Sequence, residues 1–286
     1  MDFAHAAELP IKILMRDATL GQAEMSEAII DNVASDVSAG LNKQFNGGPR
    51  DAFRLRMSNI GRAKCQLWFE KNMPAFKEPM PEQFMMNMML GDIVEAVFKG
   101  ILRTAGVEFQ DNEYVSLDLG GGRRPIKGEY DLVMAGRVDD VKSASDYSYT
   151  KKFVDLETLQ ASDPFGYVAQ LAGYAKASNK KAGGWWVVNK ANGQFKYVEA
   201  EGLDVDQTLL EVDEKLKRLN QNEFARDFEP VEETFRSKPT GNKVLSVSCK
   251  FCNFKADCWP TLKTLPSIPS SARNPADVDY VYIAEG

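Results

Sequence analysis

The chain has 286 residues, of which 27% are charged and 44% hydrophobic, and its formal net charge is -6. This composition is typical of a soluble globular protein, and the length suits one large domain or two small ones. The sequence shows neither a signal peptide nor an apolar run of about 18 residues, so it predicts a cytoplasmic protein (host cytoplasm for a viral one) with no membrane partner. The net negative charge excludes a general coating of phosphate-binding residues but allows a local basic groove.

The only histidine is His5, in a terminal segment that we expect to be frayed. A lone terminal histidine excludes Ser-His-Asp triads, Cys-His nucleophiles and His-ligated zinc. Any hydrolysis must therefore depend on carboxylates, lysine and a metal ion.

Residues 1–57 carry a broken helical pattern and predict a helical N-terminal extension. Ser58 is a candidate cap for a helix over residues 60–71, which contains Cys65. For Cys65 alone, a buried structural role is the favoured interpretation.

A long helix is predicted to start at Pro81 and to end at Gly106. Within it, Gly91, Glu95 and Lys99 share one face at i, i+4 spacing. Glycine costs about 1 kcal/mol inside a helix, so Gly91 predicts the close approach of another group one turn before Glu95. A surface glutamate on a solvated face is the alternative.

Residues 126–145 predict a hairpin with a two-residue turn at Ala135-Gly136. Such a turn pairs Met134 with Arg137. Counting outward from this pair sets the register of the two strands.

In this register Asp131 lies opposite Asp140, and like charges held at about 4.5 to 5.5 Å between Cβ atoms are destabilising without a cation. Lys142, two residues beyond Asp140, faces the same side. The hairpin therefore predicts a divalent-cation site beside an ammonium group, an arrangement suited to phosphodiester cleavage. An exposed hairpin with a solvated polar face is the alternative.

Residues 147–153 interleave aromatic and basic side chains, which suits either contact with nucleotides or an ordinary polar connection. Asp163-Pro164 predicts the start of a helix that reaches Ser178. That helix places Gln170 and Tyr174 on one face, where both can donate hydrogen bonds to a phosphate or a water without adding charge.

A second hairpin is predicted over residues 183–189 and 194–200, and an amphipathic helix over 204–220. The order helix, hairpin, helix, hairpin, helix predicts an α/β fold with a mixed central sheet flanked by helices.

All four cysteines fall outside this pattern: Cys249, Cys252 and Cys258 form a C-x2-C-x5-C run, and Cys65 lies far upstream. Four thiolates suit either a tetrahedral zinc or an iron-sulfur cluster. Disulfides are not expected in a cytoplasmic protein. From Leu265 onward the chain is rich in Pro, Ser and Ala and predicts a loosely attached tail.

Taken together, these motifs resemble the RecB-type branch of the PD-(D/E)XK nuclease superfamily over residues 58–262. More narrowly, they resemble its iron-sulfur members, typified by the AddB nuclease domain and the CRISPR-associated RecB-like exonucleases. The matching motifs are G-x-x-x-E at Gly91 and Glu95, G-x-x-D at Gly128 and Asp131, D-x-K at Asp140-Val141-Lys142, Q-x-x-x-Y at Gln170 and Tyr174, and the four cysteines. Asp139 leaves a one-residue ambiguity, which the x-Lys spacing decides in favour of Asp140.

The resemblance implies roles for these residues. Glu95, Asp131, Asp140 and the Val141 carbonyl would hold one or two Mg2+ or Mn2+ ions, because Glu95 replaces the histidine of many relatives and leaves only oxygen ligands. Lys142 would position or help deprotonate the attacking water, and Gln170 and Tyr174 would support the substrate. Cys65, Cys249, Cys252 and Cys258 would hold a 4Fe-4S cluster that staples the domain.

The function implied is a metal-dependent DNA nuclease, an exonuclease acting on DNA ends or single strands in recombination, repair or replication. Its partner is DNA, and a helicase or recombination partner protein is not identified. The alternatives are a non-cleaving DNA-binding or recombination protein that keeps the fold, and a zinc-stapled structural protein. The expected domains are an extension over 1–57, a nuclease domain over 58–262 and a tail over 263–286.

Overall fold

The hairpin predicted around Ala135-Gly136 is present in the structure, a computed structural model that describes residues 3–47, 53–221 and 223–284. The chain divides into two units that do not follow the expected boundaries after residues 57 and 262. The first comprises Met1–Asp51, Leu55–Gly61 and Pro81–Asp213, and the second Ala52–Arg54, Arg62–Met80 and Glu214–Gly286.

The first unit is built on a four-stranded sheet in the order β3-β4-β5-β6. Its strands are β3 (Leu132–Met134), β4 (Arg137–Ala144), β5 (Lys181–Asn189) and β6 (Phe195–Glu199). β4 and β5 run parallel and the other neighbours antiparallel, so the sheet is mixed, as predicted. Met134 pairs with Arg137 across a turn in which Ala135 and Gly136 both have positive φ, which confirms the predicted turn and the register of residues 132–134, while Asp131 lies outside the paired strand.

The first predicted strand of this hairpin is in fact two strands. Residues before Asp131 form β2 (Ile126–Tyr130), which pairs with β1 (Glu113–Leu117) in a separate antiparallel sheet. Asp131 lies in the break between β2 and β3. The break lets the Asp131 carboxylate turn back to the main chain of β4 instead of lying in a regular ladder.

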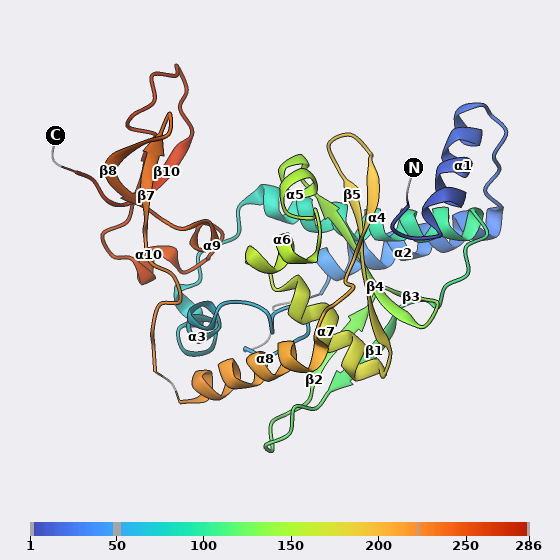
Figure 1. Ribbon diagram of the computed structural model, residues 1–286, viewed down its shortest axis with the longest axis horizontal. Coiled ribbons are helices and arrows are strands. Elements are labelled where there is room, and N and C mark those ends of the chain that lie inside the picture. The colour runs from blue at the N-terminus through green and yellow to red at the C-terminus, as the bar shows by residue number, and fades with distance from the viewer. Residues whose placement is uncertain (1–2, 48–52, 222, 285–286) are drawn as a thin grey trace. The chain divides into compact units, whose positions relative to one another are not determined.

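Helices cover both faces of the β4-β5 region (Figure 1). The first unit contains α1 (Glu8–Thr19), α2 (Glu27–Phe45), α4 (Glu82–Thr104), α5 (Asp146–Lys151), α6 (Leu156–Ala161) and α7 (Tyr167–Ser178), and α8 (Val205–Asn220) begins in it. Gly106, with φ of +69°, follows α4 as predicted. α7 begins later than the predicted Pro164, because Gly166 at φ +78° precedes the first helical residue.

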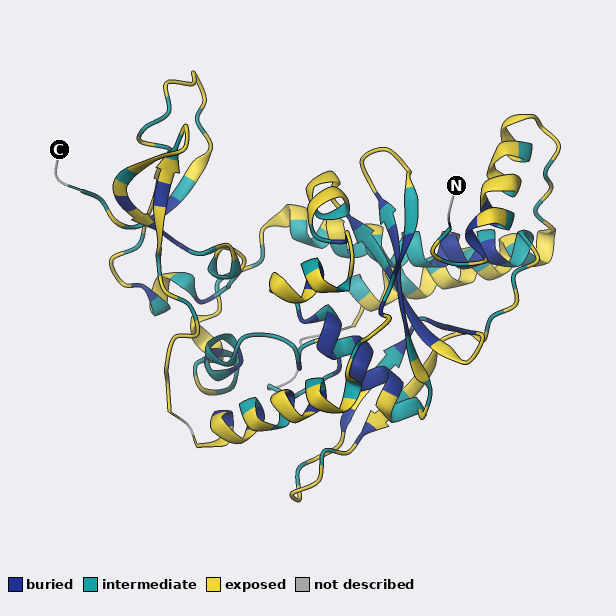
Figure 2. Cartoon of the chain, in the orientation of Figure 1, coloured by how far each residue is buried: buried dark blue, intermediate teal, exposed yellow. Residues whose placement is uncertain are grey.

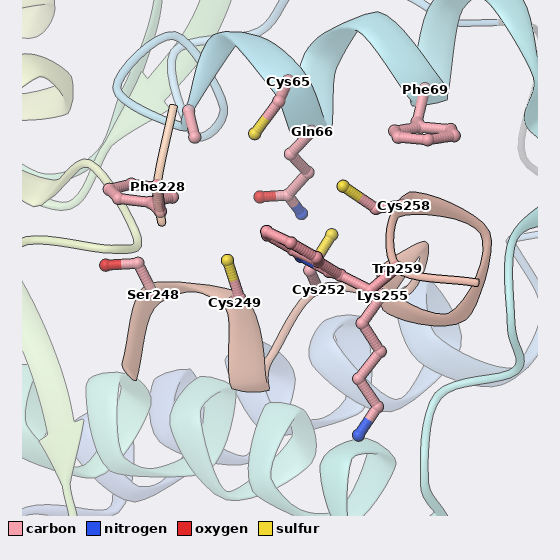
Figure 3. Close-up of a pocket in the computed structure, with 11 residues that line it drawn as sticks. Cys65, Gln66, Phe69, Phe228, Ser248, Cys249, Cys252, Lys255, Cys258 and Trp259 are labelled. Atoms are coloured by element: carbon pink, nitrogen blue, oxygen red, sulfur yellow. The ribbon is translucent and has the colours of Figure 1, made fainter. Parts of the chain in front are cut away.

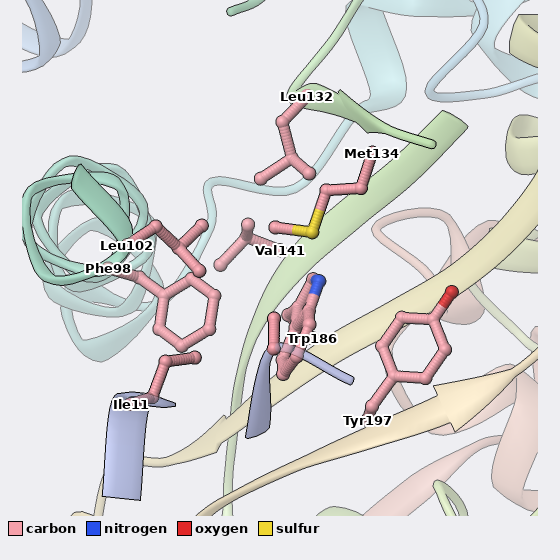
Figure 4. Packing of buried hydrophobic residues seen from close by; sticks show 9 residues of the cluster. Ile11, Phe98, Leu102, Leu132, Met134, Val141, Trp186 and Tyr197 are labelled. Carbon is pink, nitrogen blue, oxygen red and sulfur yellow. The ribbon is translucent and has the colours of Figure 1, made fainter. Parts of the chain in front are cut away.

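One face of this sheet carries an apolar core (Figure 4). Its members come from α1, α4 and four strands: Ile11, Phe98, Leu102, Leu132, Met134, Val141, Trp186 and Tyr197, together with Ala7. Figure 2 shows the inner strands as largely buried. Because Ile11 is only 1% exposed, its burial alone contributes about 1.5–3 kcal/mol.

α1 therefore contributes to the core of the first unit, whereas α2 has no buried residue and packs along α4. The helices predicted within residues 1–57 are present, but α1 is not an extension separate from that core. The expectation that His5 is frayed is also wrong. Its ring packs against Trp186 at 5.0 Å and Tyr197 at 4.7 Å between centroids. Two large aromatic surfaces thus hold the segment before α1 in place.

The second unit contains a sheet that the sequence did not predict. Its strand order is β7-β8-β10-β9, all antiparallel, with β7 (Val231–Phe235), β8 (Lys238–Val244), β9 (Lys263–Pro266) and β10 (Asp277–Tyr282). Its helices are α3 (Lys64–Asn72), η1 (Pro74–Phe76), α9 (Val247–Lys250) and α10 (Lys255–Cys258). α3 starts later than the predicted residue 60, after a turn.

The expected loose tail over 263–286 is wrong, because β9 and β10 are part of this sheet. Tyr280 on β10 is 1% exposed, and its hydroxyl donates to Glu233 Oε1 at 2.8 Å. On the same strand Asp279 pairs with Lys255 at 2.8 Å. Among the described residues, no helix is long and apolar enough to cross a membrane.

Candidate functional site

Three residues of the predicted site come together at β4. Asp140 and Lys142 lie on one face of the strand, where they form an ion pair. The backbone N–H of Val141, between them, donates to Asp131 Oδ2 at 2.6 Å. The break after β2 and the alternation of β4 thus bring the Asp131 and Asp140 carboxylates and the Lys142 ammonium group close together.

The charges of this group oppose one another. Burial, reinforced by the charge of Asp140, raises the pKa of Asp131 to about 7. For Lys142, burial lowers the pKa, but the neighbouring Asp140 and Asp131 outweigh it and leave the pKa raised. Asp131 and Asp140 therefore have a single ammonium group, that of Lys142, near them. Without a metal ion, one positive charge cannot balance both carboxylates in their ionised form.

Glu95 adds a third carboxylate from α4. Its Oε1 accepts from Lys99 Nζ at 2.7 Å, and burial together with the charge of Asp131 raises its pKa. Lys99 is only 3% exposed, so this helix face is not an ordinary solvated one. A Cβ added to Gly91 would meet nothing within 4 Å, so no described part of the chain makes the close approach predicted there.

Gln170 and Tyr174 lie next to this group on α7. Gln170 Nε2 donates to the Tyr174 hydroxyl at 3.2 Å, and Tyr174 is 3% exposed. Burial and the charge of Asp140 raise the pKa of Tyr174. A Cβ at Gly128 would lie 2.9 Å from the Tyr174 ring and 2.5 Å from Met57, so this motif glycine is required for packing.

Asp139, the alternative to Asp140, points to the other face of β4. Its Oδ1 accepts from the Tyr197 hydroxyl at 2.6 Å. Burial raises the pKa of Asp139 to about 7. The structure thus places Asp140, and not Asp139, with Asp131 and Lys142.

Across residues 3–47, 53–221 and 223–284, no three His, Cys, Asp or Glu side chains are arranged to hold a metal ion. The donor set of Glu95, Asp131 and Asp140 nevertheless has the chemistry of a Mg2+ or Mn2+ site, because its oxygens are hard ligands whose mutual repulsion a divalent cation would relieve. As placed, Asp131 is engaged by Val141 and Asp140 by Lys142. Binding an ion therefore requires these side chains to move.

The second unit brings the four cysteines to one pocket (Figure 3). Cys65 comes from α3, Cys249 from α9, Cys252 from the following loop and Cys258 from the end of α10. In Figure 3 their sulfur atoms point toward the space between α3 and the C-terminal segment, where Trp259 and Phe69 also lie. Residues far apart in the sequence are thus neighbours within one unit.

The cysteines of this pocket are expected to become thiolates only when a metal cation binds there. Burial raises the pKa of Cys65 to about 12 and that of Cys252 to about 11, so both thiols are protonated in the metal-free protein. Four sulfur donors fit zinc or an iron-sulfur cluster. As with the carboxylates, the described cysteines are not yet arranged around an ion.

Hydrogen bonds to the main chain support this pocket. The N–H of Cys65 donates to Asp227 Oδ2 at 2.8 Å. Arg226 Nε donates to the Cys258 carbonyl at 3.2 Å, and its guanidinium lies 4.1 Å from the ring centre of Trp259. Such contacts orient the backbone that carries the thiols.

Tyr167 is a residue at the carboxylate site that the sequence reasoning missed. Lys142 Nζ lies 5.1 Å from the centre of its ring. The available signal was its spacing, since Tyr167, Gln170 and Tyr174 recur at i, i+3 and i+7 on one helix face. The later start of α7 makes Tyr167 its first residue.

Comparison with known proteins gives little further information. No family model matches the chain, and no curated protein matches it. Six chains of solved structures match, among them the crystal structure of SSO0001, which is 12% identical. That match covers 82% of this chain and 98% of that chain, with a TM-score of 0.44. This level of similarity assigns neither a fold family nor a function.

Proposed function

We propose that the chain is a metal-dependent DNA nuclease with a PD-(D/E)XK core of the RecB-like type, acting as an exonuclease on DNA ends or single strands. The supporting observation is the ion pair of Asp140 with Lys142 at β4 and the bond of the Val141 N–H between them to Asp131, with Glu95 close enough for the charge of Asp131 to raise its pKa. Recombination, repair or replication is the corresponding process. We also propose that the four cysteines hold a 4Fe-4S cluster.

Each residue at β4 has a distinct role in this proposal. Glu95, Asp131, Asp140 and the Val141 carbonyl would hold Mg2+ or Mn2+, which when bound acts as a Lewis acid and lowers the pKa of a bound water. In the absence of a metal ion, the charges of Asp140 and Asp131 raise the pKa of Lys142 against the effect of burial. Lys142 would position or help deprotonate the attacking water and offset phosphate charge.

Tyr174 and Gln170 would hold the substrate. Because the Tyr174 hydroxyl accepts from Gln170, its own proton is left for donation to another acceptor. Its raised pKa keeps that proton in place at neutral pH. The pair thus offers a neutral donor to a phosphate oxygen or to the attacking water.

The test is cleavage of labelled single-stranded, double-stranded and branched DNA in Mg2+ or Mn2+. Asp140→Ala should abolish cleavage, whereas Asp139→Asn, on the other face of β4, should retain it. If the wild-type protein cleaves none of these substrates with either metal, the nuclease proposal is wrong.

Asp131→Asn is the sharper variant for the second aspartate. Asn keeps an acceptor for the Val141 N–H, whereas Ala would leave that donor without its partner and confuse loss of chemistry with loss of fold. We expect Asp131→Asn to abolish cleavage while the melting temperature of the metal-free protein stays equal or rises, because the repulsion from Asp140 is removed. Cleavage near the wild-type rate would remove Asp131 from the proposed ligands.

A further inference from the structure

One aromatic ring, that of Tyr167, lies beside Lys142 at the candidate site, and two further rings pack against it. The Tyr167 ring, which lies 5.1 Å from Lys142 Nζ, packs against Phe165 at 5.7 Å and 29° and against Phe153 at 5.6 Å and 31°. Phe153 is buried at 3% exposure, whereas Tyr167 and Phe165 are half-buried. The three rings therefore run from the buried Phe153 to the half-buried Tyr167 and Phe165, and Tyr167 lies next to the ammonium group.

Local structure fixes the position of Tyr167. The N–H groups of Gly166 and Val168 donate to the Asp163 carboxylate at 2.8 and 2.9 Å, one on each side of Tyr167. Gly166 adopts φ of +78° and packs directly on Gly61, whose added Cβ would lie 2.3 Å from the Gly166 Cα. Tyr167 is thus held by its backbone, so its ring has a defined place beside Lys142 without an induced change.

The chemistry of this position suits a nucleotide. Lys142 supplies the positive charge that a phosphate requires, and the adjacent rings supply a flat apolar surface on which a base can stack. In the proposed function, the metal ligands and the Gln170-Tyr174 pair would contact the phosphate and the water. None of these residues would contact the base.

We propose that Tyr167 and Phe165 form a stacking platform for an unpaired base next to the phosphate that Lys142 engages. The identification of the ligand as nucleic acid rests on the proposed function, but the platform predicts a property that cleavage chemistry does not. Binding should require a base as well as a sugar-phosphate backbone. Tyr167 is a substrate-binding residue in this inference, because its ring would contact the base and not the reacting atoms.

The test compares two single-stranded oligonucleotides of equal length and charge, one of thymidines and one of abasic residues. Their binding is measured by fluorescence anisotropy without divalent cations, so that no cleavage is needed. The wild-type protein should bind the thymidine strand about tenfold more tightly, the range expected for stacking of a base on an aromatic side chain.

Variants then assign this preference to the platform. Tyr167→Ala should bring the preference close to one, while Tyr167→Phe should retain it because the ring remains. Tyr114→Ala is the matched control, since Tyr114 is 78% exposed on β1. If Tyr167→Ala fails to fold by circular dichroism, Phe165→Ala takes its place and should also reduce the preference.

Equal binding of the two strands by the wild-type protein overturns the inference, and so does a preference that survives both alanine substitutions. A base preference in a protein that cleaves no DNA would support the platform while the nuclease proposal fails. Cleavage of DNA without a base preference would support the nuclease proposal and overturn the stacking platform.

Discussion

Adjacent aspartates on β4 have different environments because a strand turns successive side chains to opposite faces. Asp140 meets Asp131 and Lys142, whereas Asp139 accepts from Tyr197. The D-x-K spacing allowed this assignment from sequence, because Asp140 and Lys142 must share a face whatever the strand's neighbours are. The partner of Asp139 could not be predicted, since Tyr197 comes from another hairpin.

Asp139 makes the stability of the metal-free protein depend on pH. Burial, which outweighs the hydrogen bond from Tyr197, raises its pKa from 3.8 to about 7. The folded protein therefore keeps a proton that the unfolded chain releases, so this residue lowers the free energy of unfolding as pH rises from about 4 to about 7. Above about pH 7, the free energy of unfolding lost through Asp139 no longer changes with pH.

Asp139→Asn should remove this dependence while keeping an acceptor for the Tyr197 hydroxyl. We expect the variant to gain stability relative to wild type between pH 5 and pH 8, by an amount on the order of a few kcal/mol. Urea denaturation of both proteins at the two pH values measures it. A difference that is the same at both pH values would show that Asp139 is ionised throughout.

At the level of elements, the sequence predicted that α3 and α7 exist but placed their first residues too early. Asp163 does accept from N–H groups at the start of α7, as its sequence context suggested. The helix nevertheless starts at Tyr167, because Gly166 is left-handed and lies against Gly61. That contact joins segments far apart in the chain, which local capping rules do not reach.

The close contact between these two glycines is testable against a matched site. Ala at φ near +70° costs about 1–2 kcal/mol, and this cost applies to both Gly166→Ala and Gly106→Ala. Only at Gly166 would the new Cβ lie 2.4 Å from the Gly61 Cα, whereas at Gly106 it meets nothing within 4 Å. Gly166→Ala should therefore destabilise the protein more, as measured by chemical denaturation.

Gly166→Ala should also lower DNA cleavage, because it displaces the first turn of α7 and with it Tyr167 and Gln170. Gly106→Ala, at the end of α4, should leave the rate of cleavage unchanged. Equal destabilisation by the two substitutions would show that the chain relaxes around the Gly61 contact at no cost.

For the molecule as a whole, periodicity predicted the mixed sheet of the first unit but not the sheet of the second. The run DVDYVY at 277–282 alternates as β10 requires, yet the Pro- and Ser-rich residues before it indicated a tail. The strand is held by Tyr280 and its bond to Glu233, a partner from β7 that no local pattern identifies. Likewise, Cys65 was grouped with Cys249, Cys252 and Cys258 because of the resemblance to iron-sulfur nucleases, and no spacing rule predicts that it lies near them.

The division into units changes what loss of a cysteine should do. All four cysteines belong to the second unit, whereas Glu95, Asp131, Asp140 and Lys142 belong to the first. Protein purified without oxygen should be brown and contain about four iron atoms, as expected for a cluster held by four thiolates. Colourless protein with one tightly bound zinc would contradict the iron-sulfur proposal and leave the nuclease proposal standing.

Cys258→Ser should loosen the second unit, because a bound cluster would tie α3 to the C-terminal segment and its binding is coupled to folding. Hydrogen exchange should then accelerate in residues 62–80 and 214–286 more than in 81–213. Ser248→Ala, which alters the same pocket without removing a thiol, is the control and should exchange as wild type does. Faster exchange spread equally over both units would mean that the four cysteines stabilise the chain as one cooperative body, and unchanged exchange would mean that they do not staple it.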